Sequence, residues 1–263
     1  MSARHCLAVL ATALAALLAP APATAQSAVD GDAPMGSQIR LHEGVAEDQP
    51  RVEVSLEASV AGMDVSGHQR EVDWGHWWRQ GKRFVYVKAT EGTGFRNPYY
   101  RGQYDGSRGV GMIRGAYHFA LPDRSSGAAQ ANYFVDNGGG WRGDGHTLPG
   151  ALDIEYNPYG QSCYGLSQDA MSRWIKDFSD TYHRRTGRWP TVYTSTSWWA
   201  TCTGNRLNLS GTNPLWVARY ASSVGALPHA WPFYTFWQYT SKPLDQNTFN
   251  GAYHRLQVLA RGH

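Results

Sequence analysis

The sequence contains few cysteines and lacks the usual motifs of metal and nucleotide sites. Its 3 cysteines show no Cys-x-x-Cys spacing, and its 10 histidines include no pair four residues apart, which argues against a zinc site. The glycine-rich stretch 136–145 lacks the Lys-Ser/Thr of a phosphate-binding loop. There is also no Gly-x-Ser-x-Gly motif, which would indicate a nucleophilic serine. We therefore expect neither a metal ion nor a cofactor.

Residues 1–25 have the pattern of a secretory signal peptide. An apolar run at 6–19 follows Arg4 and His5 and is too short to span a bilayer. A small-x-small triplet at 23–25 provides a cleavage site. Because no second run of this kind follows, we expect a secreted protein with no membrane partner.

Cleavage after residue 25 removes Cys6 and leaves Cys163 and Cys202. In an oxidising compartment, two remaining cysteines most simply pair. We therefore expect a disulfide between Cys163 and Cys202, with two buried free thiols as the alternative.

Charge divides the rest of the chain into an acidic leader and a basic part. Residues 26–58 carry 7 acidic and 2 basic residues without a sustained hydrophobic period, and we interpret them as a linker or N-terminal tail, disordered or loosely docked. Residues 59–263 carry 21 Lys and Arg against 14 Asp and Glu. This balance suits a polyanion such as a bacterial envelope with anionic wall polymers. Scattered basic residues and secretion argue against nucleic acid, and a merely soluble surface remains the alternative.

Short β-rich runs alternate with helical segments after residue 60. The expected strands are 61–66, 83–90, 111–120, 150–156, 190–195, 215–220 and 235–240. The expected helices lie around 74–80, 97–107, 126–136 and 167–186. Strands that alternate with helices indicate an α/β fold with a parallel sheet, and seven or eight of them predict a closed barrel. Helix signals fade after residue 190, so we expect an incomplete outer helical layer.

Four carboxylates fall at the carboxyl ends of three expected strands: Asp64, Glu91, Asp153 and Glu155. Asp153 and Glu155 lie two residues apart and therefore share one face of their strand. Catalytic groups of parallel barrels occupy this rim. Clustered carboxylates raise one another's proton affinity, so one stays protonated as a general acid while its neighbours ionise, as glycoside hydrolysis requires. The alternative is that Asp153 and Glu155 are structural acids paired with Arg or Lys.

Aromatic residues support a sugar ligand. The chain has 11 Trp and 15 Tyr, many of them beside expected strand ends. Their rings stack on sugar faces, while a neighbour such as Gln238 bonds hydroxyl or acetamido groups. His118 is interpreted as a structural histidine that lines the pocket.

Seven motifs follow one another along the chain: GMDVSGHQREVDW, FVYVKATEGTGFRNPYY, GAYHFA, ALDIEY, PTVYTSTSWW, LWVARY and FWQYTS…LDQNTFNG. Together they resemble glycoside hydrolase family 25, the muramidases often called Chalaropsis-type lysozymes, over roughly residues 60–260. The resemblance implies an irregular (β/α)5β3 barrel, TIM-like, as a single catalytic domain at 59–263. It also implies metal-free cleavage, with net retention, of the β-1,4 bond between N-acetylmuramic acid and N-acetylglucosamine in peptidoglycan.

The resemblance also assigns roles to the acids. Glu155 becomes the general acid that protonates the leaving oxygen and later the base that activates water. Asp153 orients and stabilises the 2-acetamido group in a substrate-assisted route. Asp64 alternatively stabilises the oxocarbenium-like charge directly, and the sequence leaves the shares of these two residues open.

Four further residues are expected to bind the substrate: Asp245, Tyr117, Trp237 and Glu91. The loop before Asp245 is shorter than the family pattern, which leaves its placement open. The expected partners are peptidoglycan glycan strands, acted on by a monomer. A chitinase-like hydrolase and a non-catalytic wall-binding lectin are the alternatives.

Overall fold

Within the described residues, eight strands close into a barrel and a ninth short strand forms a hairpin on one of them. The computed structural model describes Met1, residues 31–44 and residues 59–262. The strands are β1 (Ser59–Val65), β2 (Phe84–Glu91), β3 (Phe95–Arg96), β4 (Ile113–Phe119), β5 (Ala151–Asp153), β6 (Thr191–Thr194), β7 (Leu215–Ala218), β8 (Phe236–Thr240) and β9 (Gln246–Asn250). Their order is β1-β9-β8-β7-β6-β5-β4-β2-β3, and the β1–β2 pairing closes the ring. The last barrel strand, β9, runs antiparallel to both β1 and β8.

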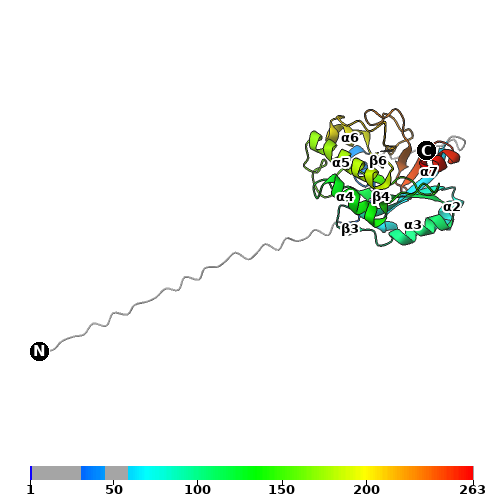
Figure 1. Cartoon of the computed structure of the whole chain (residues 1–263), viewed down its shortest axis with the longest axis horizontal. Coiled ribbons are helices and arrows are strands. Elements are labelled where there is room, and N and C mark those ends of the chain that lie inside the picture. Colours follow the sequence, from blue (N-terminus) through cyan, green and yellow to red (C-terminus); the bar gives the residue numbers. More distant parts are fainter. Residues whose placement is uncertain (2–30, 45–58, 263) are drawn as a thin grey trace.

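Helices follow the first five barrel strands and lie outside the ring (Figure 1). They are α2 (Trp74–Arg79), α3 (Tyr100–Gly109), α4 (Gly127–Phe134), α5 (Gln168–Thr186) and α6 (Thr196–Thr203). In the part of the chain from residue 59 to 262, no helix separates β7, β8 and β9. This is the expected (β/α)5β3 barrel. The described chain also includes α1 (Ile39–Glu43), the short 3-10 helix η1 (Gly67–Gln69), the π-helix η2 (Val135–Gly139) and the helix α7 (Tyr253–Arg261).

The seven expected strands are all present as β1, β2 and β4 to β8, and the expected helices are α2 to α5. Helix α5 agrees with the expected range 167–186: the Ser167 side chain accepts a hydrogen bond from the Ala170 amide at its start, and Gly187 ends the helix in a left-handed conformation. Sequence reasoning missed β9, whose residues are mostly polar although its neighbours bury them. It also missed α6 and α7, which have only 8 and 9 residues.

Aromatic rings fill the lower part of the barrel. The Phe236 ring lies 5.2 Å from Phe84 and 5.6 Å from Tyr86, centre to centre. Gly62 and Gly115 make room for these rings, because a Cβ at either position would overlap Phe84 or Tyr86. Side chains on a barrel strand alternate between inside and outside. The three rings of Phe84, Tyr86 and Phe236 are called the aromatic floor below. The next inward positions lie above it, at the carboxyl ends of the parallel strands.

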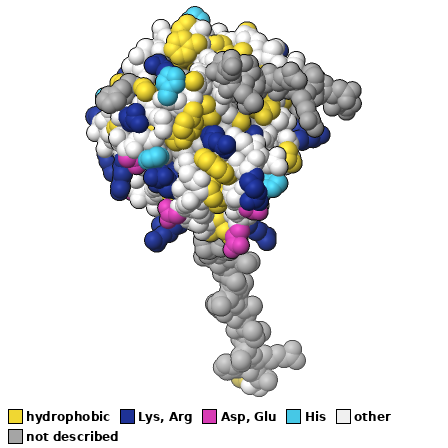
Figure 2. All heavy atoms as spheres, turned by 90° about the vertical axis from the view of Figure 1, so that its right-hand side faces the viewer, with side chains coloured by type: hydrophobic (Ala, Val, Ile, Leu, Met, Phe, Trp, Pro, Cys, Tyr) yellow, Lys and Arg dark blue, Asp and Glu magenta, His cyan; other side chains and the backbone are white. Residues whose placement is uncertain are grey.

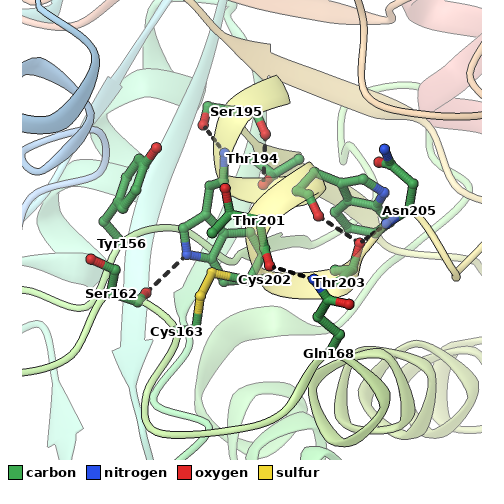
Figure 3. The surroundings of a disulfide bond; sticks show 12 residues. Tyr156, Ser162, Cys163, Gln168, Thr194, Ser195, Thr201, Cys202, Thr203 and Asn205 are labelled. Carbon is green, nitrogen blue, oxygen red and sulfur yellow. Dashed lines mark hydrogen bonds between the residues drawn. A yellow bond between two sulfur atoms is a disulfide. The ribbon is translucent and has the colours of Figure 1, made fainter.

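Cys163 and Cys202 form the expected disulfide, which joins the loop after β5 to α6 (Figure 3). Two hydrogen bonds reinforce this junction. The Trp198 indole donates to the Ser162 carbonyl oxygen at 3.0 Å, and the Gln168 amide donates to the Thr201 carbonyl oxygen at 3.1 Å. The disulfide therefore fixes the loop that follows Glu155.

On the face that Figure 2 shows, basic side chains are spread out rather than gathered. Figure 2 shows Lys and Arg between hydrophobic and polar side chains on one face, with few Asp and Glu. Of the described helices, none has both the length and the apolar character needed to cross a membrane. The predicted signal peptide lies outside the described residues, apart from Met1.

Replacing both disulfide cysteines, Cys163→Ser/Cys202→Ser, is expected to lower the Tm by about 10 °C. The bridge closes a loop of 39 positions, and its loss removes roughly 3–4 kcal/mol on the chain-entropy model. Thermal unfolding followed by circular dichroism measures the change. A reductant should produce the same shift in the unaltered protein and none in the variant; equal Tm values for the two proteins contradict the prediction.

Candidate active site

Polar side chains from seven strands meet above the aromatic floor. They occupy the inward positions nearest the carboxyl ends of the parallel strands and the start of the antiparallel one: Asp64, Lys88, Tyr117, Asp153, Tyr193, Gln238 and Asn247. All seven are buried. The two-residue alternation that places aromatic rings below therefore places hydrogen-bonding and charged groups here.

Asp64 is held by side-chain amide donors from the last two barrel strands, β8 and β9. Its Oδ2 accepts hydrogen bonds from Gln238 Nε2 at 2.9 Å and from Asn247 Nδ2 at 2.7 Å. Burial raises the pKa of Asp64 to about 6, and hydrogen bonds from Asn247, Gln238 and Asp245 limit the rise. Asp64 is thus a buried carboxyl group whose ionised form has dedicated partners.

Asp245 lies beside Asp64 despite the short loop before it. It immediately precedes β9, and because β9 is antiparallel, this end of the strand lies at the same rim as the carboxyl end of β1. The two carboxyl groups share a hydrogen bond. Burial, followed by the charge of Asp64, raises the pKa of Asp245 well above its usual value.

Glu155 and Asp153 are both fully buried. Burial raises the pKa of Glu155 to about 8, and for Asp153 burial and the Glu155 charge raise the pKa well above the usual range. Among the described residues, neither oxygen of Asp153 has a hydrogen-bond partner, nor does Oε2 of Glu155. These two acids therefore favour their protonated forms near neutral pH.

Lys88 carries a positive charge at the carboxyl ends of the parallel strands, which are called the barrel mouth below. The sequence analysis did not identify it. Its Nζ lies 2.5 Å from Glu91 Oε2 and 3.1 Å from Asp32 Oδ1. Glu91 also accepts a hydrogen bond from the Tyr159 hydroxyl at 2.6 Å. Its place in the sequence could have indicated it, because Lys88 lies within a mostly apolar expected strand, and every residue of β2 is buried. Glu91 is therefore tied to Lys88, unlike Asp153 and Glu155.

The two aromatic residues expected to bind the substrate, Tyr117 and Trp237, lie in different places. The Tyr117 hydroxyl lies among the acids and has no hydrogen-bond partner in the described chain; burial, then the charge of Asp64, raises the pKa of this hydroxyl. Trp237 instead belongs to the opposite face of β8 from Gln238. Its indole donates to the carbonyl oxygen of Arg219, the residue after β7, at 2.8 Å.

His118 is a structural residue, as expected, but the prediction that it lines the pocket is wrong. Strand alternation points it outward, opposite to Tyr117. Its ring nitrogens lie 2.7 Å from Thr90 Oγ1 and 2.9 Å from Gln130 Oε1. Burial lowers the pKa of His118 to about 3, so the ring is neutral.

Residues 31–44 lie at this mouth, although the sequence suggested disorder or loose docking for the segment that contains them. Met35 and Ile39 are each 1% exposed, and the Gly36 amide donates to Glu155 Oε1 at 2.5 Å. Main-chain contacts of this kind leave no pattern in side-chain types. The rest of 26–58 lies outside the described residues, and the division of the chain at residues 25 and 58 stays a prediction.

In residues 31–44 and 59–262, no group of three or more His, Cys, Asp or Glu is arranged to hold a metal ion. The chemistry that this arrangement offers is proton transfer between carboxyl groups with different proton affinities.

Comparisons with known proteins agree with this geometry. The model of glycosyl hydrolases family 25 matches residues 63–248. Lysozyme M1 of Streptomyces globisporus is 43% identical over an alignment of 270 residues, which covers 99% of this chain and 91% of that protein. An N,O-diacetylmuramidase of Arthroderma benhamiae is 48% identical over 223 residues, covering 83% and 94% of the two chains. The solved muramidase from Acremonium alcalophilum has 58% identity and a TM-score of 0.76, covering 78% of this chain and 100% of its own.

Glu155→Gln is expected to stabilise the protein at alkaline pH. The folded pKa of Glu155, about 8, exceeds the ordinary value of 4.5, so unfolding releases a proton between these values and stability falls as pH rises. Glutamine cannot ionise, and the variant should unfold several degrees higher than the unaltered protein at pH 9.

Thermal unfolding at pH 4 and pH 9 measures this effect. Glu71→Gln, the same substitution at an exposed position, is the matched control and should leave the Tm unchanged at both pH values. A Glu155→Gln variant that is less stable than the unaltered protein at pH 9 contradicts the raised pKa.

Proposed function

The chain belongs to glycosyl hydrolases family 25, and we propose that it is a secreted muramidase. It cleaves the β-1,4 bond between N-acetylmuramic acid and N-acetylglucosamine in peptidoglycan, with retention of configuration. The observation that carries this proposal is the cluster of the buried Asp64, Asp153 and Glu155 with the partly buried Asp245 at the barrel mouth. The names of its relatives, lysozyme and muramidase, support the same bond.

Glu155 supplies the proton in the first step. Its raised pKa keeps it protonated near neutral pH. The carboxyl group transfers its proton to the glycosidic oxygen as the bond from that oxygen to the anomeric carbon breaks. The oxygen of the substrate's 2-acetamido group then bonds to the anomeric carbon from the opposite side. In the second step water bonds to the anomeric carbon as the bond from that carbon to the acetamido oxygen breaks, and the water gives its proton to the Glu155 carboxylate, so two inversions produce net retention.

Asp64 and Asp153 support this sequence in different ways. Asp64 has the lower pKa, because Asn247 and Gln238 donate to its carboxylate, and it ionises while Glu155 is still an acid. We assign to Asp64 the stabilisation of the positive charge that develops at the anomeric carbon. Asp153 has free oxygens within the described site and accepts the acetamido N–H.

The remaining assignments follow from position and charge. Asp245 and Tyr117 lie in the cluster and bind the sugar, while Glu91 acts from its ion pair with Lys88 and Trp237 from the outer edge of the mouth. Residues 59–263 carry the excess of Lys and Arg, which attracts anionic wall polymers. The predicted signal peptide and the disulfide support secretion, and we propose a monomer.

Glu155→Gln is expected to slow peptidoglycan cleavage by at least about a hundredfold, because the amide cannot donate the proton. The assay compares residues 59–263 with and without the substitution. It measures release of reducing ends and identifies the products by mass spectrometry. Glu71→Gln is the control for the same change of side chain at an exposed position, and it should retain full activity.

The products decide between the alternatives. Fragments ending in reducing N-acetylmuramic acid support the proposed bond, whereas reducing N-acetylglucosamine ends contradict it. No release by the unaltered protein, together with binding to cell walls, indicates a lectin. Release that continues unchanged in Glu155→Gln assigns the proton to another residue.

The rate should follow a bell-shaped pH profile. Activity needs Asp64 ionised and Glu155 protonated, so kcat/KM rises with pH through the pKa of Asp64, about 6, and falls through that of Glu155, about 8. Initial rates on peptidoglycan between pH 4 and pH 10 measure both limbs. A rate that still rises above pH 9 contradicts Glu155 as the acid.

A further inference from the structure

Residues 31–44 contact the mouth through their main chain, beginning at its centre. The Gly36 amide donates to Glu155 Oε1 at 2.5 Å, and the Gly36 carbonyl oxygen accepts a hydrogen bond from the Tyr220 hydroxyl at 3.2 Å. A glycosidic oxygen that receives the Glu155 proton must come within hydrogen-bond distance of this carboxyl group. Gly36 therefore occupies one oxygen of a carboxyl group that is fully buried while the segment is docked, which leaves the substrate no access to it.

Contacts on the amino-terminal side of Gly36 engage the ion pair of the mouth. Asp32 Oδ1 lies 3.1 Å from Lys88 Nζ, which also donates to the Ala33 carbonyl oxygen at 2.6 Å. The Ala33 amide donates to Glu91 Oε2 at 3.1 Å. This part of the segment completes the coordination of two buried charges of opposite sign.

Contacts on the carboxyl-terminal side extend to the loop after β5. Glu43 accepts hydrogen bonds from the Tyr156 hydroxyl, at 3.0 Å, and from the Ser195 hydroxyl. The His42 ring stacks on Tyr156, with ring centres 4.1 Å apart and planes 7° from parallel. Between these anchors the side chains of Met35 and Ile39 are buried. The segment is thus attached at both ends and apolar in the middle.

Gly36 fits its position only because it lacks a side chain. Its φ is +74°, and a Cβ would lie 2.6 Å from Gln238 Oε1 and 2.8 Å from the Tyr193 hydroxyl oxygen, and closer still to Tyr220. Gly44, at the end of the segment, also has a φ of +74°, but a Cβ there would meet nothing within 4 Å. The two glycines share a backbone conformation and differ in their surroundings.

We propose that residues 31–44 are an intramolecular inhibitor that keeps the glycan site closed while they remain docked. This inference rests on the proposed muramidase activity of the same site. Opposite charge supports docking, since residues 26–58 have 7 acidic and 2 basic residues whereas residues 59–263 carry an excess of Lys and Arg. Separation of the segment from the barrel opens the site.

A solved relative of about the length of the barrel supports testing the barrel without the segment. The whole chain of the solved Acremonium alcalophilum muramidase matches 78% of this chain, about the share that residues 59–263 represent. The match to Lysozyme M1, in contrast, spans 99% of this chain and so extends into the leader. Residues 59–263 are therefore a suitable reference for the uninhibited enzyme.

Gly36→Val in residues 26–263 is expected to raise the rate of peptidoglycan cleavage by at least about tenfold, towards that of residues 59–263. The added side chain would overlap Tyr220, Gln238 and Tyr193 and so weaken the docking that tethering favours. Gly44→Val is the matched control and should leave the rate low. A synthetic peptide of residues 31–44 should inhibit residues 59–263 by raising KM without lowering kcat. The same peptide with Gly36→Val should not inhibit.

Two results overturn the proposal: equal rates for residues 26–263 and 59–263, or equal activation by Gly36→Val and Gly44→Val. If residues 59–263 release no reducing ends, the proposed function fails instead. Hydrogen exchange of residues 31–44 in the 26–263 protein then decides whether the segment occupies the mouth. Protection that Gly36→Val removes and Gly44→Val retains supports occupancy, while unprotected amides contradict it.

Discussion

Burial of several carboxyl groups at one barrel mouth is the constraint that organises this molecule. A buried carboxylate needs partners or must keep its proton. Asp64 receives amide donors from Gln238 and Asn247, and Glu91 receives Lys88, whereas Asp153 and Glu155 have few partners and hold protons more tightly. The unequal supply of donors turns chemically similar side chains into an acid and a stabilising anion. Ionisation of the buried Asp153 and Glu155 is also unfavourable, so these acids lower the stability of the folded protein at a place where the reaction requires them.

Much of this arrangement could be predicted from the sequence, because it depends on strand periodicity. Asp153 and Glu155 were found since two acids share a face next to buried neighbours, and Asp64 since it ends another strand. The buried partners were harder to find. Lys88 has a side chain that sequence patterns assign to solvent, and Asn247 lies on β9, whose mixed polar residues show no apolar alternation. The contacts of Gly36 could not be predicted at all, because main-chain amides are present at almost every residue.

The fold could also be predicted from the periodicity of the sequence, and the part that departs from a regular barrel, the antiparallel strand β9, helps to build the site. Fading helix signals after residue 190 indicated an incomplete outer layer, and the chain indeed completes its barrel with strands alone. The antiparallel direction of β9 brings its first residues to the rim where the parallel strands end. Asp245 reaches Asp64 in this way without a long loop. A regular parallel barrel would have placed the same residue at the opposite rim.

Residues 31–44 belong to the same polypeptide as the barrel, and this affects how the enzyme responds to dilution. A separate inhibitor dissociates when a protein is secreted into a large volume, because binding between two molecules depends on their concentrations. A tethered segment meets the Glu155 carboxyl group at a local concentration set by the length of the connecting chain. Docking is therefore the same at the site of synthesis and far from the cell, and distance alone does not switch the enzyme on.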